Sequence, residues 1–226
     1  MLTDDTGTPG NGKFEINLGA TMAYKRRLSK DFDYQTPQLD ANYGLGDRTE
    51  LTWLQPWGIH HSVDHTTSDI GPTLLGLKYR FYDNDKTKVT VSVYPQFVFS
   101  PLYASVKHHV SDPGVQVLLP VQCQKQFKYF DLGGEMGYTV VTENSDIAFW
   151  GVVASRQVTK RLEMLGEMHG EHETQTGGVG VVADVASRIN LVDEKVKLML
   201  LAGRGFITHR TDNSGFFGYI GFQFNF

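Results

Sequence analysis

Apolar and polar side chains alternate along most of this chain with the period of two that is typical of β-strands. In the first such segment, KFEINLGATMAY, Phe14 and Leu18 share one face of an extended strand, and Glu15 lies on the other. The same alternation recurs in residues 88–99, 115–124, 131–140, 161–171 and 179–190. Weaker alternation marks residues 34–43, 49–57 and 72–82. The pattern predicts an all-β protein.

The final segment, GYIGFQFNF, places Phe222, Phe224 and Phe226 on one face and polar residues on the other. A water-soluble protein buries an aromatic face of this kind. A membrane barrel instead exposes the aromatic face to lipid and turns the polar face towards a wet interior. The alternation therefore favours strands that cross a membrane.

Two segments leave the strand register open. Residues 146–158 fit either phase, so Arg156 has no assigned side. In residues 194–206, the register that turns Leu200 outward also turns Arg204 outward. That position of Arg204 requires a bulge or a site above the lipid.

The links between the expected strands alternate in length. Five are short turns, at residues 44–48, 83–86, 125–129, 158–161 and 192–195. The other six are mostly longer and more polar, at residues 25–31, 58–69, 100–113, 142–146, 171–177 and 208–215. This layout predicts a transmembrane antiparallel up-and-down β-barrel of about twelve strands, formed by residues 1–226 as a single domain. Residues 1–12 are then expected to be an N-terminal segment in the periplasm.

Composition agrees with a barrel and excludes other classes of protein. No stretch approaches the roughly 18 consecutive apolar residues of a membrane helix, and the mean hydropathy is −0.27. A barrel has this neutral average because its polar and apolar residues alternate. The net charge of −4 argues against nucleic acid as a partner, because such proteins present a basic surface. A soluble β-sandwich or lipocalin-like barrel is the alternative fold, and it would turn its apolar faces inward.

Cysteine content and the start of the chain give two further expectations. The single cysteine, Cys123, excludes an internal disulfide framework. The residues after Met1 lack the basic start and apolar core of a signal peptide. If the protein is exported, we expect its leader to have been removed already.

The segment GFQFNF resembles the C-terminal signal read by the bacterial barrel-assembly machinery, with Gly221, Phe224 and Phe226 matching and Ile220 departing from the usual polar residue. The opening LTDDTGTPGNGKFEINLG, the turn ANYGLGDRTEL and the strand GLKYRFYD extend the likeness. Together they resemble a poorly characterised family of proteobacterial outer-membrane β-barrels, labelled as transporters or as MetA-like phenol-degradation proteins. The resemblance implies a location in the bacterial outer membrane, in contact with its lipid.

The polar faces of the strands carry charges of both signs into the expected lumen. The residues expected to line it are Glu15, Asp40, Glu50, Lys78, Arg80, Glu135, Glu163, Glu167, Asp184 and Arg188, with Arg161 and Lys197 beside them. One interpretation is a closed barrel filled by paired charges, because unpaired charges in a confined space are costly. The other is a narrow channel whose charged walls orient a small polar solute. Small lumen-facing residues such as Gly133 and Gly137 favour the channel.

Two functions therefore remain open at this point. The favoured one is an outer-membrane channel or transporter for passive passage of a small, unidentified solute. The alternative is a closed structural barrel that scaffolds partner proteins through its extracellular loops.

All eight histidines lie in or beside the longer links. Two successive loops are the richest, and they contain His60, His61, His65, His108 and His109. Imidazole ligands, with nearby carboxylates, suit divalent transition metals, which suggests a metal site at the extracellular rim as a hypothesis. The alternative is that histidine is simply a polar residue suited to loops. We expect no other cofactor.

An outer-membrane hydrolase is the weakest alternative. The loop HHSVDH contains Ser62, His61 and Asp64, which are the residue types of a catalytic triad. Triads are assembled in space, however, and the chain has no GxSxG motif. We therefore expect no enzymatic activity.

Overall fold

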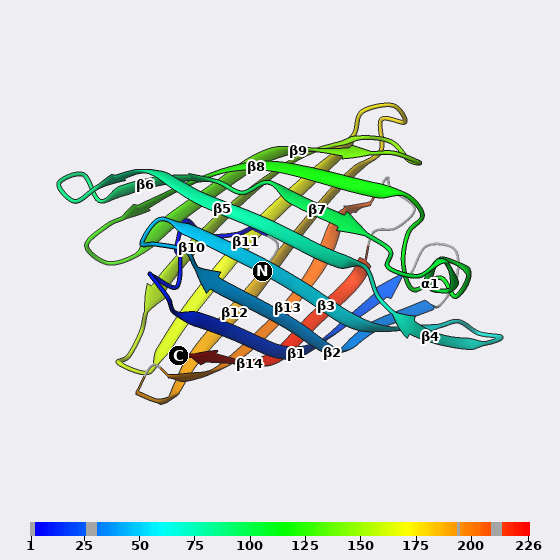
Figure 1. Ribbon diagram of the computed structural model, residues 1–226, viewed down its shortest axis with the longest axis horizontal. Helices are drawn as coiled ribbons and strands as arrows, with labels where there is room; N and C mark the ends of the chain where they lie inside the picture. Colours follow the sequence, from blue (N-terminus) through cyan, green and yellow to red (C-terminus); the bar gives the residue numbers. More distant parts are fainter. Residues whose placement is uncertain (1–2, 26–30, 194, 209–213) are drawn as a thin grey trace.

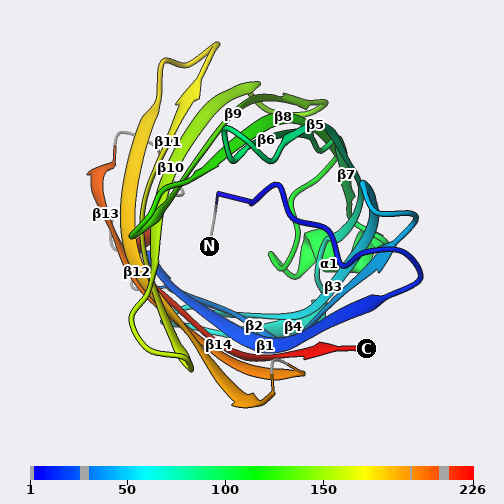
Figure 2. The ribbon, with the colours of Figure 1, turned by 90° about the vertical axis from the view of Figure 1, so that its left-hand side faces the viewer.

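The computed structural model describes residues 3–25, 31–193, 195–208 and 214–226. These residues form one antiparallel sheet and the short helix α1 (Tyr103–Lys107). The strands are β1 (Phe14–Lys25), β2 (Asp31–Gly44), β3 (Thr49–His61), β4 (Thr66–Ile70), β5 (Thr73–Asn84), β6 (Val89–Val93), β7 (Gln96–Phe99), β8 (Val115–Gln126), β9 (Asp131–Val141), β10 (Ile147–Gln157), β11 (Leu162–Glu173), β12 (Val179–Val192), β13 (Val196–Thr208) and β14 (Ser214–Asn225). The sheet closes into a barrel because β1 pairs with both β2 and β14 (Figures 1 and 2).

The fourteen strands occupy twelve positions in the barrel wall. β4 and β5 both pair with β3 and share one position, interrupted at Gly71 and Pro72. β6 and β7 both pair with β5 and β8 and share another, interrupted at Tyr94 and Pro95. Proline has no amide hydrogen for the ladder, which explains why each interruption falls at a proline. The predicted barrel of about twelve strands is confirmed.

The outward face of the wall is apolar, as contact with lipid requires. In β9, Leu132 and Met136 are exposed outside, whereas Glu135 between them is buried inside the barrel. In β11, Met168 is exposed outside and Glu167 is buried inside. An apolar exterior with a polar interior identifies the wall as a transmembrane barrel and excludes the soluble alternative.

The structure resolves both uncertain registers. In β10, Phe149 and Val153 are buried inside the barrel, which turns Arg156 outward at the short-turn end. In β13, Arg204 is exposed near the long-loop end, close to a register shift between Val181 and Val182 of β12. Of the two expected explanations for an outward Arg204, a bulge or a site above the lipid, a bulge is present close by.

The connections follow the predicted alternation, with one correction. Residues 58–69 are not a long loop, because β3 continues to His61 and β4 begins at Thr66, leaving a hairpin turn at residues 62–65. The polar Thr and His residues of this extension concealed its strand character. Residues 100–113 contain α1, and the links at residues 25–31 and 208–215 fall largely outside the described residues. Within the described ranges, no helix has the length and apolar character of a membrane span.

The predicted assembly signal lies at the C-terminal end of β14, the strand that closes the barrel by pairing with β1. The backbone N–H of Phe226 donates to the carbonyl of Phe14, 2.9 Å away, and the Phe226 ring is largely exposed. Phe224 pairs with Val196 of β13 and Gly221 with Met199. Recognition of these residues by the assembly machinery remains a prediction.

Candidate functional site

The described part of the N-terminal stretch runs into the barrel from its short-turn end, where the sequence predicted a periplasmic segment (Figure 2). Thr3 and Thr6 are almost completely buried. The backbone N–H of Thr3 donates to the Glu167 carboxylate on β11, and the Thr6 hydroxyl donates to Gln124 Oε1 on β8 at 3.1 Å. Residues 3–9 are called the N-terminal segment below. Its position inside the lumen is the main feature that sequence reasoning missed.

Lys78 on β5 attaches the N-terminal segment to one side of the lumen. Its Nζ atom lies 3.3 Å from Asp4 Oδ1 and 3.5 Å from Glu50 Oε1 on β3. The same ammonium lies 4.7 Å from the ring centroid of Tyr94, and Lys78 is only 3% exposed. Burial makes these contacts strong, because little water competes for the charge.

Arg188 on β12 attaches the segment to the opposite side. Its Nη2 atom lies 4.0 Å from Asp5 Oδ2, and Nη1 donates to Glu163 Oε2 on β11 at 3.4 Å. Burial acts to raise the pKa of Asp5, but the positive charges of Lys78 and Arg188 outweigh it and lower that pKa below its ordinary value. Asp5 is therefore held as a carboxylate.

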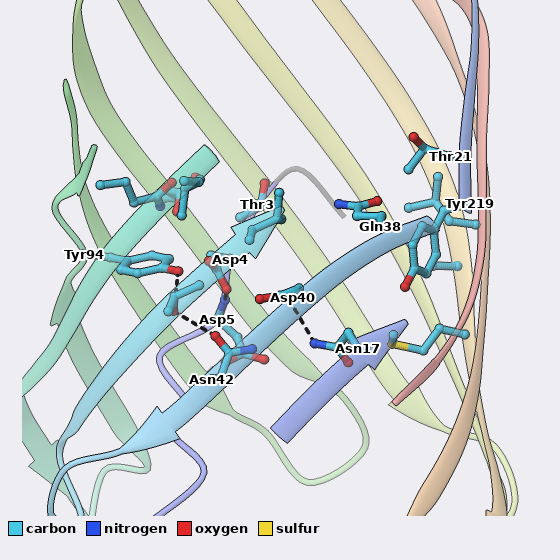
Figure 3. Close-up of a pocket in the computed structure, with 18 of the residues that line it drawn as sticks. Thr3, Asp4, Asp5, Asn17, Thr21, Gln38, Asp40, Asn42, Tyr94 and Tyr219 are labelled. Atoms are coloured by element: carbon cyan, nitrogen blue, oxygen red, sulfur yellow. Dashed lines mark hydrogen bonds between the residues drawn. The ribbon is translucent and has the colours of Figure 1, made fainter. Parts of the chain in front are cut away.

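The wall formed by β1, β2 and β14 carries acids that bind amides instead of cations (Figure 3). Asn17 Nδ2 donates to Asp40 Oδ2 at 3.0 Å and to Glu15 Oε1 at 3.3 Å. Gln223 Nε2 donates to Glu15 Oε2 at 2.6 Å. The Asn17 and Asp40 Oδ1 atoms are buried and have no hydrogen-bond partner among the described residues.

A cavity of about 800 Å³ lies inside the barrel beside the N-terminal segment. Seven carboxyl groups line it, from Asp4, Asp5, Glu15, Asp40, Glu50, Glu135 and Glu171. Of the lysine and arginine side chains that the structure describes, only Lys78, Arg188 and Lys197 line it. The excess of carboxyl groups makes the cavity attractive to cations.

Most of the predicted lumen-lining residues face the interior. Six line the main cavity: Glu15, Asp40, Glu50, Lys78, Glu135 and Arg188. Glu163 lines a smaller adjoining cavity, and the register partners Glu167 and Asp184 are buried on β11 and β12. Arg80 shares the inward phase of Lys78 on β5 but lies near the short-turn end, where it pairs with Asp83 at 3.2 Å and donates to the Asp47 carbonyl at 2.8 Å. Arg161, by contrast, is exposed in the turn between β10 and β11.

Sequence reasoning did not include Asp4 and Asp5, because they precede the first periodic segment. One signal was nevertheless present in the sequence. Asp4 and Asp5 are adjacent acids that precede the first strand, and the inward-facing positions of the predicted barrel include Lys78 and Arg188.

The link between β7 and β8, residues 100–114, is called the α1 loop and folds across the long-loop end of the barrel (Figure 2). Ser105 of α1 is completely buried. Val110 packs so closely on Gly58 of β3 that a Cβ atom there would lie 2.1 Å from Val110 Cγ1. Glycine is therefore required at position 58 for this approach.

Histidine–carboxylate contacts accompany the α1 loop at the rim. His108 Nδ1 lies 3.0 Å from Asp69 Oδ2, and His60 Nδ1 lies 2.7 Å from Asp33 Oδ1. The ring of His60 is centred 6.0 Å from that of His109.

The other two histidines of the metal hypothesis lie in the same region. The His65 ring is centred 6.4 Å from that of His60, whereas His61 Nδ1 contacts Thr66 Oγ1. Among the described residues, no group of three or more histidine, cysteine or acidic side chains is arranged to hold a metal. Metal binding at this rim remains a prediction.

Ser62 Oγ contacts His65 Nδ1 at 3.1 Å, and not the His61 ring of the suggested triad.

The closed barrel, apolar outside and polar inside, defines the fold of an outer-membrane β-barrel protein. The chain is similar in structure to the COG4313 outer membrane channel from Pseudomonas putida F1, with a TM-score of 0.76 and 13% identity, covering 99% of this chain and 98% of that one. It is also similar to the KdgM porin (TM-score 0.63, 8% identity, 94% and 99% of the two chains) and to the NanC porin (TM-score 0.62, 9% identity, 93% and 98%). No family model and no curated protein matches the sequence. At these identities the similarity establishes the fold.

Proposed function

We propose that this protein is a channel of the bacterial outer membrane that passes small polar solutes, cations in preference to anions, and that its N-terminal segment restricts the passage. The observation that carries the proposal is the acid-lined cavity of about 800 Å³ inside a transmembrane wall. A hydrophilic cavity through a barrel gives polar solutes a path that the bilayer denies them. The descriptions of the three similar structures as an outer membrane channel and porins add support.

Charge gives the proposed channel its selectivity. Carboxyl groups outnumber lysine and arginine side chains along the cavity by seven to three. Lys78 and Arg188 pair with Asp4, Glu50 and Asp5. Among the described lining residues, the other carboxyl groups still outnumber Lys197 by four to one. The net negative potential raises the local concentration of cations. No step of bond making or breaking is required, so the protein is proposed to act without enzymatic activity.

Planar-bilayer recordings test the proposal. The full-length protein is expected to give small conductance steps, and a chain lacking residues 2–12 is expected to give steps several-fold larger, because the segment no longer occupies the lumen. In a KCl gradient, the reversal potential of both proteins should lie closer to the equilibrium potential of potassium than to that of chloride, which indicates cation preference. A matched control replaces Asp64, in the exposed turn after β3, with Asn and should behave as wild type. Silence from both proteins, each with the heat-shifted gel band of a folded barrel, would reject the channel.

A closed barrel that scaffolds partners through its loops is the second candidate. The observation that favours it is that the N-terminal segment and the α1 loop both fold within the outline of the barrel, one at each end. This function gives no conductance in either protein. It predicts instead that partner proteins co-purify and are lost when the hairpin turn at residues 62–65 is shortened.

A further inference from the structure

Two basic residues end lipid-facing rows at the short-turn end of nearby strands. On β8, Lys125 follows Leu119 and Val121 on the outward face, and both of these apolar residues are exposed. On β10, Arg156 follows Val152 in the same way. A long basic side chain at the end of an apolar row keeps its aliphatic part beside lipid tails while its charge reaches the headgroups.

β9 separates these two residues and provides an apolar surface between them. Leu132 at the start of β9 pairs with Lys125 on one side and with Ala154 on the other. Arg156 lies two residues beyond Ala154, so the backbones of Lys125 and Arg156 are roughly 12 Å apart, from the spacing of strands and of residues along them. Both side chains are long enough to reach one headgroup between them.

The turn between β8 and β9 adds aromatic rings and another cation. The rings of Phe127 and Phe130 stack with centroids 4.8 Å apart. Lys125 Nζ lies 5.0 Å from the Phe127 centroid, and Lys128 Nζ lies 5.1 Å from that of exposed Tyr129. Aromatic rings of this kind prefer the boundary between lipid tails and headgroups. The next turn contributes Lys160, which is exposed.

These cations, Lys125, Lys128, Arg156 and Lys160, form what is called the basic strip. In the described part of the chain, none of the four forms an ion pair. Asp131 is near in sequence but lines an internal cavity with Glu163. By contrast, Lys88 in the preceding turn lies 3.9 Å from Asp85. The positive charge of the basic strip is therefore free to meet an external anion.

We propose that the basic strip binds an anionic phospholipid of the periplasmic leaflet, with its phosphate between Lys125 and Arg156 and its acyl chains along the outer face of β9. A phospholipid supplies both parts of the complementary surface, a negative headgroup and apolar tails. Each basic residue close to an anionic membrane surface adds about 1 kcal/mol of attraction, which is about fivefold in affinity. A zwitterionic lipid offers the tails without the net charge.

Native mass spectrometry of the full-length protein in detergent tests this site with phosphatidylglycerol and phosphatidylcholine as probes. Wild type is expected to retain phosphatidylglycerol in preference to phosphatidylcholine. The double variant Lys125→Gln/Arg156→Gln is expected to weaken phosphatidylglycerol binding about 25-fold, from two losses of about fivefold. The exchange Lys125→Arg/Arg156→Lys, which keeps both charges, should restore it.

The control variant Lys13→Gln/Lys195→Gln removes the same charge from the same end of the barrel, at strands β1 and β13. It should change phosphatidylglycerol affinity less than twofold. Equal loss in the two double variants, or equal retention of both lipids by wild type, would overturn the proposal. Lipid binding at the basic strip rests on the proposed outer-membrane location, with the short turns on the periplasmic side, but not on an open lumen, so this result is separable from the conductance measurements.

Discussion

The two segments that fold within the outline of the barrel are held in different ways. The N-terminal segment is bound by Lys78 and Arg188, which project from the wall into the interior. The α1 loop is bound at the solvent-exposed rim by His108 and Asp69 and by the packing of Val110 on Gly58. Removing one partner of a buried charge pair typically costs 3–5 kcal/mol, whereas an exposed pair contributes about 0–1 kcal/mol. A single substitution is therefore expected to disturb the N-terminal segment more than the α1 loop. Only deletion of the segment should have a larger effect.

Lys78→Met is expected to have the largest effect of any point substitution, because it leaves Asp4 and buried Glu50 without their cation. We expect a loss of about 3 kcal/mol in the free energy of unfolding and conductance steps close to those of the chain lacking residues 2–12. Arg188→Met should cost only about 1 kcal/mol, because its partners are partly exposed. Urea titration and single-channel recording measure both effects.

Lys197→Met is the matched control for these two substitutions. Lys197 lines the same cavity, and no ion pair joins it to another described residue. Its replacement should leave the step size near that of wild type. If all three variants behave alike, the ion pairs do not hold the segment.

Acid should release the N-terminal segment only below the ordinary aspartate range. Because the pKa of Asp5 is lowered in the folded protein, its contribution is fully present above the unfolded value of 3.8 and is lost as pH falls through the lower folded pKa. The part of the acid-induced rise in conductance that depends on Asp5 is therefore expected only below about pH 4. Asp5→Asn should remove the Asp5 part of this rise. If the difference in conductance between wild type and Asp5→Asn were instead centred at pH 6, the assignment to Asp5 would be wrong.

The α1 loop should respond least. His108→Leu removes an exposed contact with Asp69, worth at most about 1 kcal/mol. The opening of the loop is measured by thiol labelling of Ser105→Cys in a Cys123→Ser background, since Ser105 is buried only while the loop is docked. We expect labelling to accelerate by no more than about fivefold, which is that energy expressed as a rate. Faster labelling would show that the rim contact is as important as the ion pairs inside.

The sequence predicted the wall because its signal is local. Alternation places Glu135 and Met136 on opposite faces whatever the rest of the chain does. The phase of β10 was not accessible in this way, since Phe149, Trp150 and Val153 are all apolar and only the neighbouring strands decide which of them faces inward. The charged inward rows could be predicted, but not which of their residues share a partner.

The N-terminal segment was beyond reach of the same reasoning because its structure depends on distant contacts. Thr3 binds Glu167, which lies 164 residues away in sequence, and the segment itself has no periodicity. The rim histidines show the same limit. Their common end of the barrel followed from the loop lengths, whereas the contact of His60 with Asp33 depends on the register of β2 and β3.

The N-terminal segment is a ligand covalently tethered to its own receptor. It is joined to β1 through only a few residues, so it samples its binding site at an effective concentration in the millimolar range. A separate peptide with the sequence of residues 3–9 would need a comparable concentration to occupy the truncated barrel to the same extent as the tethered segment. Contacts with a dissociation constant below that range therefore keep the native segment in place, and each departure from the lumen is brief and reversible.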